Sequence, residues 1–182
     1  MRSLTTNQLL PVSIDALKFC QQGVQVSGFL PLARLQRLSQ QLYVAEGNVQ
    51  AELLFGLDQQ SRKTVSGHLE AVLPLVCQRC LERIDVPVAA ELSLALVWND
   101  DQAAQLPRTL DPVVMDGEDL DLLEIVEEEL LLALPLVAIH DEGVCQPPKP
   151  LVEQVIVDEP VETKVNPFQV LATLKTPAKN AE

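Results

Sequence analysis

Four segments in the first half of the chain alternate between apolar and polar residues with a period of two. These segments span residues 24–30, 49–57, 65–75 and 84–98. Alternation of this kind predicts strands that bury one face and expose the other to water. Because the connections between neighbouring segments are mostly short, we expect an antiparallel sheet.

Helical spacing of apolar residues interrupts this pattern early in the chain. A short helix is predicted over 15–22. A second helix is predicted over 32–42, where Leu35, Leu38 and Leu42 fall on one face. Together with the strands, these helices indicate an α+β fold with an antiparallel sheet as its body.

The clearest helical pattern covers residues 119–134, which follow a loop predicted over 99–110. We expect Asp119 to cap this helix and Pro135 to end it. One face of the helix is apolar and the other acidic, which is typical of an amphipathic helix on a core. Its carboxyl-terminal half is apolar on nearly all sides, so we expect that end to be buried.

The last part of the chain differs from the rest in composition. Residues 146–165 are rich in proline and acidic residues, which predicts a linker with a short strand at 152–157. We therefore expect one α+β domain over 1–145 and an extended tail over 146–182. A short helix is predicted from Asn166, with an apolar side formed by Phe168, Leu171 and Leu174. This side either docks on the chain's own domain or binds in a groove of a partner.

Charge is concentrated in one segment. The chain has 182 residues, with 13 lysines and arginines against 26 acidic residues, for a net charge of −13. Residues 1–98 have no net charge, whereas 99–142 contain Arg108 as their single base and have a net charge of −12. This distribution argues against a broad electrostatic surface for nucleic acid. Aromatic residues make up only 3% of the chain, so few rings are available to stack on bases.

The acidic helix itself allows two interpretations. Its carboxylates can simply form a solvated helix face, which is the common role of such charge runs. Alternatively, the face is a docking surface for a basic protein or a mimic of RNA. The candidate partner-binding residues on it are Glu124, Glu127 and Glu128.

Two cysteines form the sharpest local motif. Cys77 and Cys80 lie on a turn between two predicted strands, at a spacing that lets both thiolates bind one zinc ion. Cys145 is a candidate third ligand and His140 a candidate fourth. The alternative is a hairpin turn whose cysteines are small half-buried apolar residues. A thioredoxin-like pair is disfavoured because a strand, not a helix, follows the motif. Cys20 falls in a helical pattern and is expected to be buried and inert.

No motif of an enzyme is present in the sequence. It has no glycine-rich phosphate loop, nucleophile elbow or paired-histidine metalloprotease motif. The longest apolar run, 130–139, is too short to span a membrane, and the first residues do not resemble a signal peptide. We therefore expect a cytoplasmic protein that is neither an enzyme nor membrane-bound.

Three stretches in this order resemble one family. They are the Cys77–Cys80 turn followed by Leu81, the acidic helix running on to His140 and Cys145, and the closing segment 166–175. Together with residues 11–15 they make the chain similar to the YceD family, the large ribosomal RNA subunit accumulation proteins. Many members have a second cysteine pair after the acidic helix. This chain has only Cys145 there, which leaves His140 as the nearby substitute.

The resemblance implies a non-enzymatic role in the synthesis, processing or stability of large-subunit (23S) ribosomal RNA. Combined with the charge, it favours contacts of 99–142 with a basic large-subunit ribosomal protein or a pre-ribosomal particle, and disfavours binding to naked RNA. The alternative is a zinc-binding RNA-processing enzyme or regulator built on Cys77 and Cys80. A redox-sensing module is a third hypothesis, which requires an unusually reactive thiol at Cys77 or Cys80.

Overall fold

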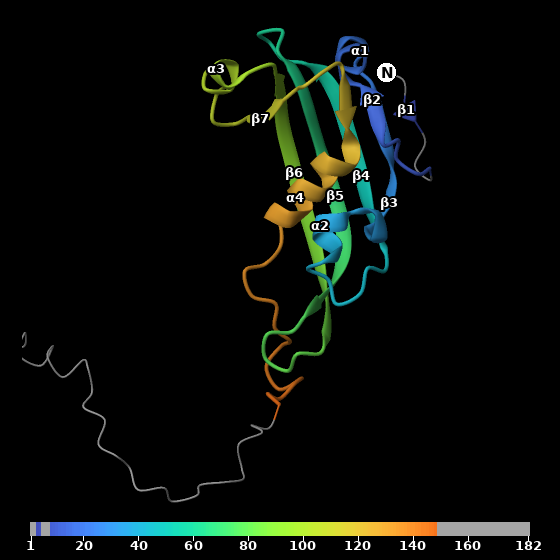
Figure 1. Cartoon of the computed structure of the whole chain (residues 1–182), viewed down its shortest axis with the longest axis vertical. Helices are drawn as coiled ribbons and strands as arrows, with labels where there is room; N and C mark the ends of the chain where they lie inside the picture. The colour runs from blue at the N-terminus through green and yellow to red at the C-terminus, as the bar shows by residue number, and fades with distance from the viewer. Residues whose placement is uncertain (1–2, 5–7, 149–182) are drawn as a thin grey trace, which may run out of the picture. The chain divides into compact units, whose positions relative to one another are not determined.

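A six-stranded sheet forms the body of the protein in the computed structural model, which describes residues 3–4 and 8–148 (Figure 1). Its four central strands are antiparallel neighbours in chain order. They are β3 (Gln25–Pro31), β4 (Asn48–Leu57), β5 (Lys63–Val76) and β6 (Arg83–Val97). The predicted strands and the α+β class are therefore confirmed.

The edges of the sheet were not visible in the sequence pattern. On one side β1 (Ser3–Leu4) runs parallel to β3, and on the other β7 (Asp111–Val114) runs parallel to β6. A separate antiparallel pair joins β2 (Ser13–Asp15) to β8 (Asp119–Asp121). All of these strands are short, and short strands leave too few residues to show an alternation.

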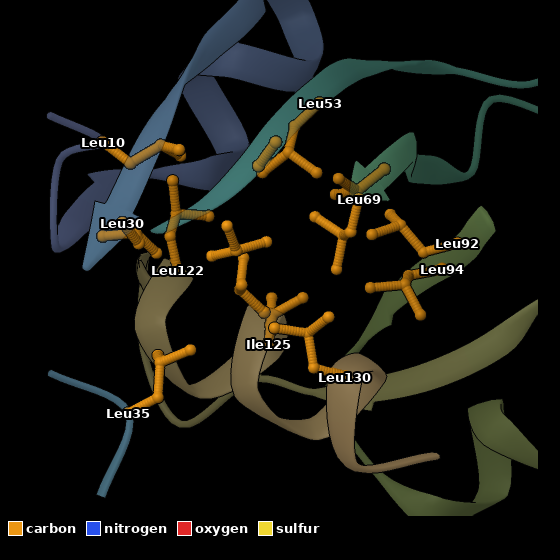
Figure 2. Packing of buried hydrophobic residues seen from close by; sticks show 14 of the residues in the cluster. Leu10, Leu30, Leu35, Leu53, Leu69, Leu92, Leu94, Leu122, Ile125 and Leu130 are labelled. Carbon is orange, nitrogen blue, oxygen red and sulfur yellow. The ribbon is translucent and has the colours of Figure 1, made fainter. Parts of the chain in front are cut away.

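One face of the sheet carries the core. Apolar residues alternate along β4 and β5, and Leu53, Phe55, Leu69 and Leu73 are fully buried. Figure 2 shows α4 (Leu122–Leu132) presenting its side chains to those of the strands. The buried residues of α4 include Leu122, Ile125, Val126 and Leu130.

The two early helices were predicted with different success. Helix α1 (Ala16–Gln22) begins one residue later than predicted, because Asp15 is its cap, and Gly23, whose φ of 64° is left-handed, follows its last residue. The continuous helix predicted over 32–42 is wrong. It is divided into a 3₁₀ turn η1 (Leu32–Arg34) and a short α2 (Gln36–Ser39) by Leu35, whose backbone is extended.

Burial and a side chain from α4 explain this break. Leu32, Leu35 and Leu38 are all buried, so the chain follows the core instead of one helix axis. The N–H groups of Arg37 and Leu38 donate to the carboxylate of Glu127. In a continuous helix these groups would donate to carbonyls one turn earlier.

The acidic helix is shorter than predicted at its start. Residues 119–121 form β8, because Leu120 is buried and pairs with Ile14 of β2. The cap is therefore Asp121 and not Asp119, since Asp121 Oδ1 accepts hydrogen bonds from the N–H groups of Leu123 and Glu124.

The end of α4 also corrects an expectation. The helix stops before Pro135 as predicted, but its last residue, Leu132, is 77% exposed. The apolar chain that follows is exposed as well, including Leu136 and Val137. The carboxyl-terminal end of the helix is therefore not buried as a whole. Within the predicted loop, Asn99 caps a short α3 (Asp100–Ala103).

The described residues contain no helix that is long and apolar enough to cross a membrane. The predicted strand at 152–157 and the predicted helix with Phe168, Leu171 and Leu174 lie outside the described residues. Their proposed roles stay predictions.

Candidate metal centre

A tight turn between β5 and β6 carries the cysteine motif. The N–H of Cys77 donates to the carbonyl of Glu82, and the N–H of Leu81 donates to the carbonyl of Cys77. Leu81 has a left-handed φ of 65°, which closes the turn. A further N–H, that of Arg79, points at Cys77 Sγ at 3.5 Å. The turn thus holds the Cys77 and Cys80 side chains on one side.

A backbone hydrogen bond brings the other two candidate ligands to this turn. The N–H of Gln78 donates to the carbonyl of Ala138 at 2.8 Å, and the Ala138 side chain is buried. The chain after α4 therefore passes beside the tip of the β5–β6 hairpin, as Figure 1 shows. His140 lies two residues after Ala138, and Cys145 comes after a turn at Gly143, whose φ is 83°.

The four candidate ligands converge. Their ligand atoms all lie within 4.8 Å of one another. Cys77 Sγ lies 3.9 Å from Cys145 Sγ, and Cys80 Sγ lies 3.5 Å from His140 Nδ1. In a tetrahedral zinc site, bond lengths of about 2.3 Å to sulfur and about 2.0 Å to nitrogen place two sulfurs about 3.8 Å apart and a sulfur and a nitrogen about 3.5 Å apart. Two of the six separations therefore match those of a tetrahedral zinc site, and the other four are no longer than 4.8 Å.

The local electrostatics favour a thiolate at one of these positions. Burial acts to raise the pKa of Cys77, but hydrogen bonds from the backbone of Cys80, His140 and Arg79 outweigh it and lower the pKa to about 5. For Cys145, burial and the neighbouring thiol groups of Cys80 and Cys77 raise the pKa to about 11. The turn thus stabilises negative charge at Cys77, whereas no backbone hydrogen bond from a described residue lowers the pKa of Cys145.

Cys20 is separate from this group. Its side chain is 2% exposed in α1, its Sγ lies 3.7 Å from the carbonyl oxygen of Thr64, and burial raises its pKa. The predicted burial of Cys20 is confirmed. Such a thiol is a poor metal ligand or nucleophile.

The candidate partner-binding residues on α4 do not share one environment. Glu124 and Glu128 are exposed, as expected. Glu127 is only 8% exposed, so the expected solvent-facing position is wrong for this residue. Its Oε1 accepts from the N–H groups of Arg37 and Leu38, and its Oε2 accepts from Arg37 Nε. Glu127 therefore stabilises the domain itself, and no signal in the sequence links it to residues so far away.

Comparisons with known proteins agree with the resemblance noted in the sequence. A family model described as large ribosomal RNA subunit accumulation protein YceD matches residues 65–175. The "Large ribosomal RNA subunit accumulation protein YceD" of Haemophilus influenzae is 35% identical over 170 residues, which cover 91% of this chain and 96% of that protein. No solved structure matches the chain significantly. The region matched by the family model contains all four candidate metal ligands and α4.

Proposed function

This chain belongs to the YceD family, and we propose that it supports accumulation of large-subunit ribosomal RNA by binding a protein of the assembling subunit. The name of the Haemophilus influenzae relative refers to accumulation of the large ribosomal RNA subunit. The role proposed for this chain is that of a non-enzymatic factor in the cytoplasm, where ribosomes assemble.

The distribution of exposed acidic residues carries this proposal. Within residues 99–142, every acidic side chain is exposed except those of Glu127 and Glu129, and Arg108 is the only base. A surface of this kind repels the phosphates of RNA and attracts a basic protein. Ribosomal RNA would then be stabilised indirectly, through a basic large-subunit ribosomal protein or a pre-ribosomal particle that contains it.

Affinity capture from cells tests this proposal. The tagged full chain is used as bait at low and at moderate salt, with and without nuclease, and the captured material is identified by mass spectrometry and RNA sequencing. We expect a basic large-subunit ribosomal protein that survives nuclease treatment and is recovered less well at higher salt. Capture of ribosomal RNA without any ribosomal protein would contradict the proposal.

We further propose that Cys77, Cys80, His140 and Cys145 bind one zinc ion. Three sulfur ligands and one nitrogen ligand suit zinc, and a four-ligand set is closed, which is typical of a structural site. A catalytic site keeps one position open for water or substrate. The ligand set therefore favours a structural role over the alternative of a zinc-dependent RNA-processing enzyme. When bound, zinc would join the tip of the β5–β6 hairpin to the chain that follows α4.

Metal analysis of the purified full chain tests the zinc proposal. We expect one zinc per chain in the wild type, loss of zinc in C80S and C145S, and full retention in the matched control C20S. Addition of a strong chelator should increase amide hydrogen exchange over residues 136–148 and leave β4 unchanged, because only the former segment is held by the metal. Zinc-free wild-type protein, prepared without chelators, would contradict the proposal.

A further inference from the structure

A groove runs between α4 and β7, which is an edge strand of the six-stranded sheet. It consists of two adjoining hollows of about 350 and 310 Å³. Both hollows are lined by Pro112 and Val113 of β7 and by Ile125 and Glu128 of α4. We refer to it as the β7–α4 groove. Most of its lining residues belong to the acidic segment, and they come from several elements that are separate in the chain.

The floor of the groove is apolar. Leu94 of β6 and Ile125 are almost completely buried and line one of the two hollows. Leu132, at the end of α4, lines the same hollow and is 77% exposed. Covering this leucine and the apolar floor with an apolar group of a partner would remove their surface from water, which is favourable.

The rim of the groove is acidic and forms no ion pair with the described part of the chain. Its carboxylates include those of Asp111, Glu124 and Glu128, and no lysine, arginine or histidine among the described residues lines either hollow. None of the three takes part in an ion pair with a described residue. At Glu129, burial together with the nearby charges of Asp111 and Glu128 raises the pKa. Negative charges are therefore crowded here. Arg37 attracts Glu124 and Glu128 electrostatically, but its Nε pairs with Glu127.

The arrangement of these carboxylates argues against a single metal ion. Among the described residues, Cys77, Cys80, His140 and Cys145 form the only group of three or more side chains that could hold a metal ion, and it includes none of these carboxylates. Carboxylates spread along a groove instead match several positive charges spread along a chain.

We propose that the β7–α4 groove binds a basic peptide segment of a protein partner. Lysine or arginine side chains of this segment pair with Asp111, Glu124 and Glu128, and an aliphatic side chain contacts Ile125 and Leu132. The inference rests on the proposed function, because it supplies the site at which a basic ribosomal protein docks. Binding of RNA in this groove is an alternative outcome that the like charges oppose.

Variants of the full chain test this site. E128K reverses a charge on the rim, and L132S removes the exposed apolar group. Both side chains are exposed, so we expect both variants to fold. The matched controls are E91K and V72S, which make the same kinds of change on the opposite face of the sheet, where Glu91 and Val72 are exposed.

The probe is a fluorescent peptide that alternates lysine and leucine. We expect E128K to weaken its binding roughly tenfold and L132S to weaken it roughly fivefold, with E91K and V72S close to the wild type. Bound peptide should protect the amides of 111–114 and 124–132 from hydrogen exchange. An equal loss of peptide affinity in E128K and E91K would overturn the proposal. Binding of single-stranded RNA in preference to the peptide would overturn it as well.

Capture of the ribosomal protein separates failure of this site from failure of the proposed function. If E128K and L132S still capture the ribosomal protein as well as the wild type does, the groove is not its docking site, while the proposed function stands. If the wild type captures no ribosomal protein but binds the peptide in the groove, the proposed function is wrong and the groove remains a site for basic peptides.

Discussion

Glu127 and Arg37, 90 residues apart in the chain, are joined by two hydrogen bonds. The N–H of Arg37 donates to Oε1 at 2.7 Å, and its Nε donates to Oε2 at 3.0 Å. A third bond, from the N–H of Leu38 to Oε1, completes the contact. One carboxylate on α4 therefore satisfies N–H groups at the start of α2, which would otherwise have no partner in the short helix.

Removal of this carboxylate should destabilise the domain. We expect E127A to lower the free energy of unfolding by about 2 kcal/mol, because it leaves donors near the core unpaired. E127Q should lower the free energy of unfolding by less, since its amide oxygen can still accept a hydrogen bond from the backbone. The control E124A changes an exposed residue of the same helix and should stay within about 0.5 kcal/mol of the wild type. Urea unfolding measures all three; equal effects of E127A and E124A would contradict this role.

The contribution of Glu127 should depend on pH. Burial acts to raise its pKa, but the hydrogen bonds from Leu38 and Arg37 outweigh it, so the pKa is lowered in the folded protein. A lowered folded pKa means that the stabilisation is fully present above the unfolded value of about 4.3 and is lost as the pH falls through the folded value. The stability difference between wild type and E127Q should thus be constant near neutral pH and shrink in acid. A difference that grows on acidification would disprove this.

The cap of α4 provides a second test of local structure. D121A should lower the free energy of unfolding by about 1 kcal/mol, because Asp121 Oδ1 accepts from the N–H of Leu123 at 2.8 Å. D119A serves as the control, since Asp119 lies in β8 and should change stability by less than about 0.5 kcal/mol. Thermal unfolding of both variants shows which of the two aspartates caps α4. A larger loss in D119A would restore the longer helix predicted from the sequence.

Close packing of β5 against β4 provides a third test. A methyl group at Gly67 would collide with the carbonyl oxygen of Glu52 and lie 2.8 Å from Leu53 Cδ2. We expect G67A to destabilise the protein by about 2 kcal/mol, as overpacking does. At Gly56 of β4 the same methyl group meets nothing within 4 Å, so G56A should be neutral or slightly stabilising. Chemical denaturation that ranks G56A below G67A in stability would contradict this packing.

Several parts of the candidate site could be predicted because they depend on neighbours in sequence. The turn that carries Cys77 and Cys80 is local, so its place between two strands followed from the pattern on either side. His140 and Cys145 could be named as candidates from their residue types. Their approach to the turn could not be predicted, because it depends on the bond between Gln78 and Ala138 and on the burial of Ala138.

The sequence by itself determined the elements whose periodicity extends over many residues. An alternation along nine or more residues predicted β4, β5 and β6, and the α1 and α4 helices followed from apolar spacing, although the cap of α4 is Asp121 and not the predicted Asp119. The concentration of acidic residues in 99–142 was equally a property of the sequence.

Only the tertiary structure decided where distant residues meet. It placed 119–121 in a strand because Leu120 pairs with Ile14, and it divided the helix at Leu35 because Glu127 takes the N–H groups of Arg37 and Leu38. It also separated the buried Glu127 from the exposed Glu124 and Glu128, which the helical pattern had grouped together. Local patterns report which face of an element is apolar, whereas the partner of a polar group depends on how the whole chain packs.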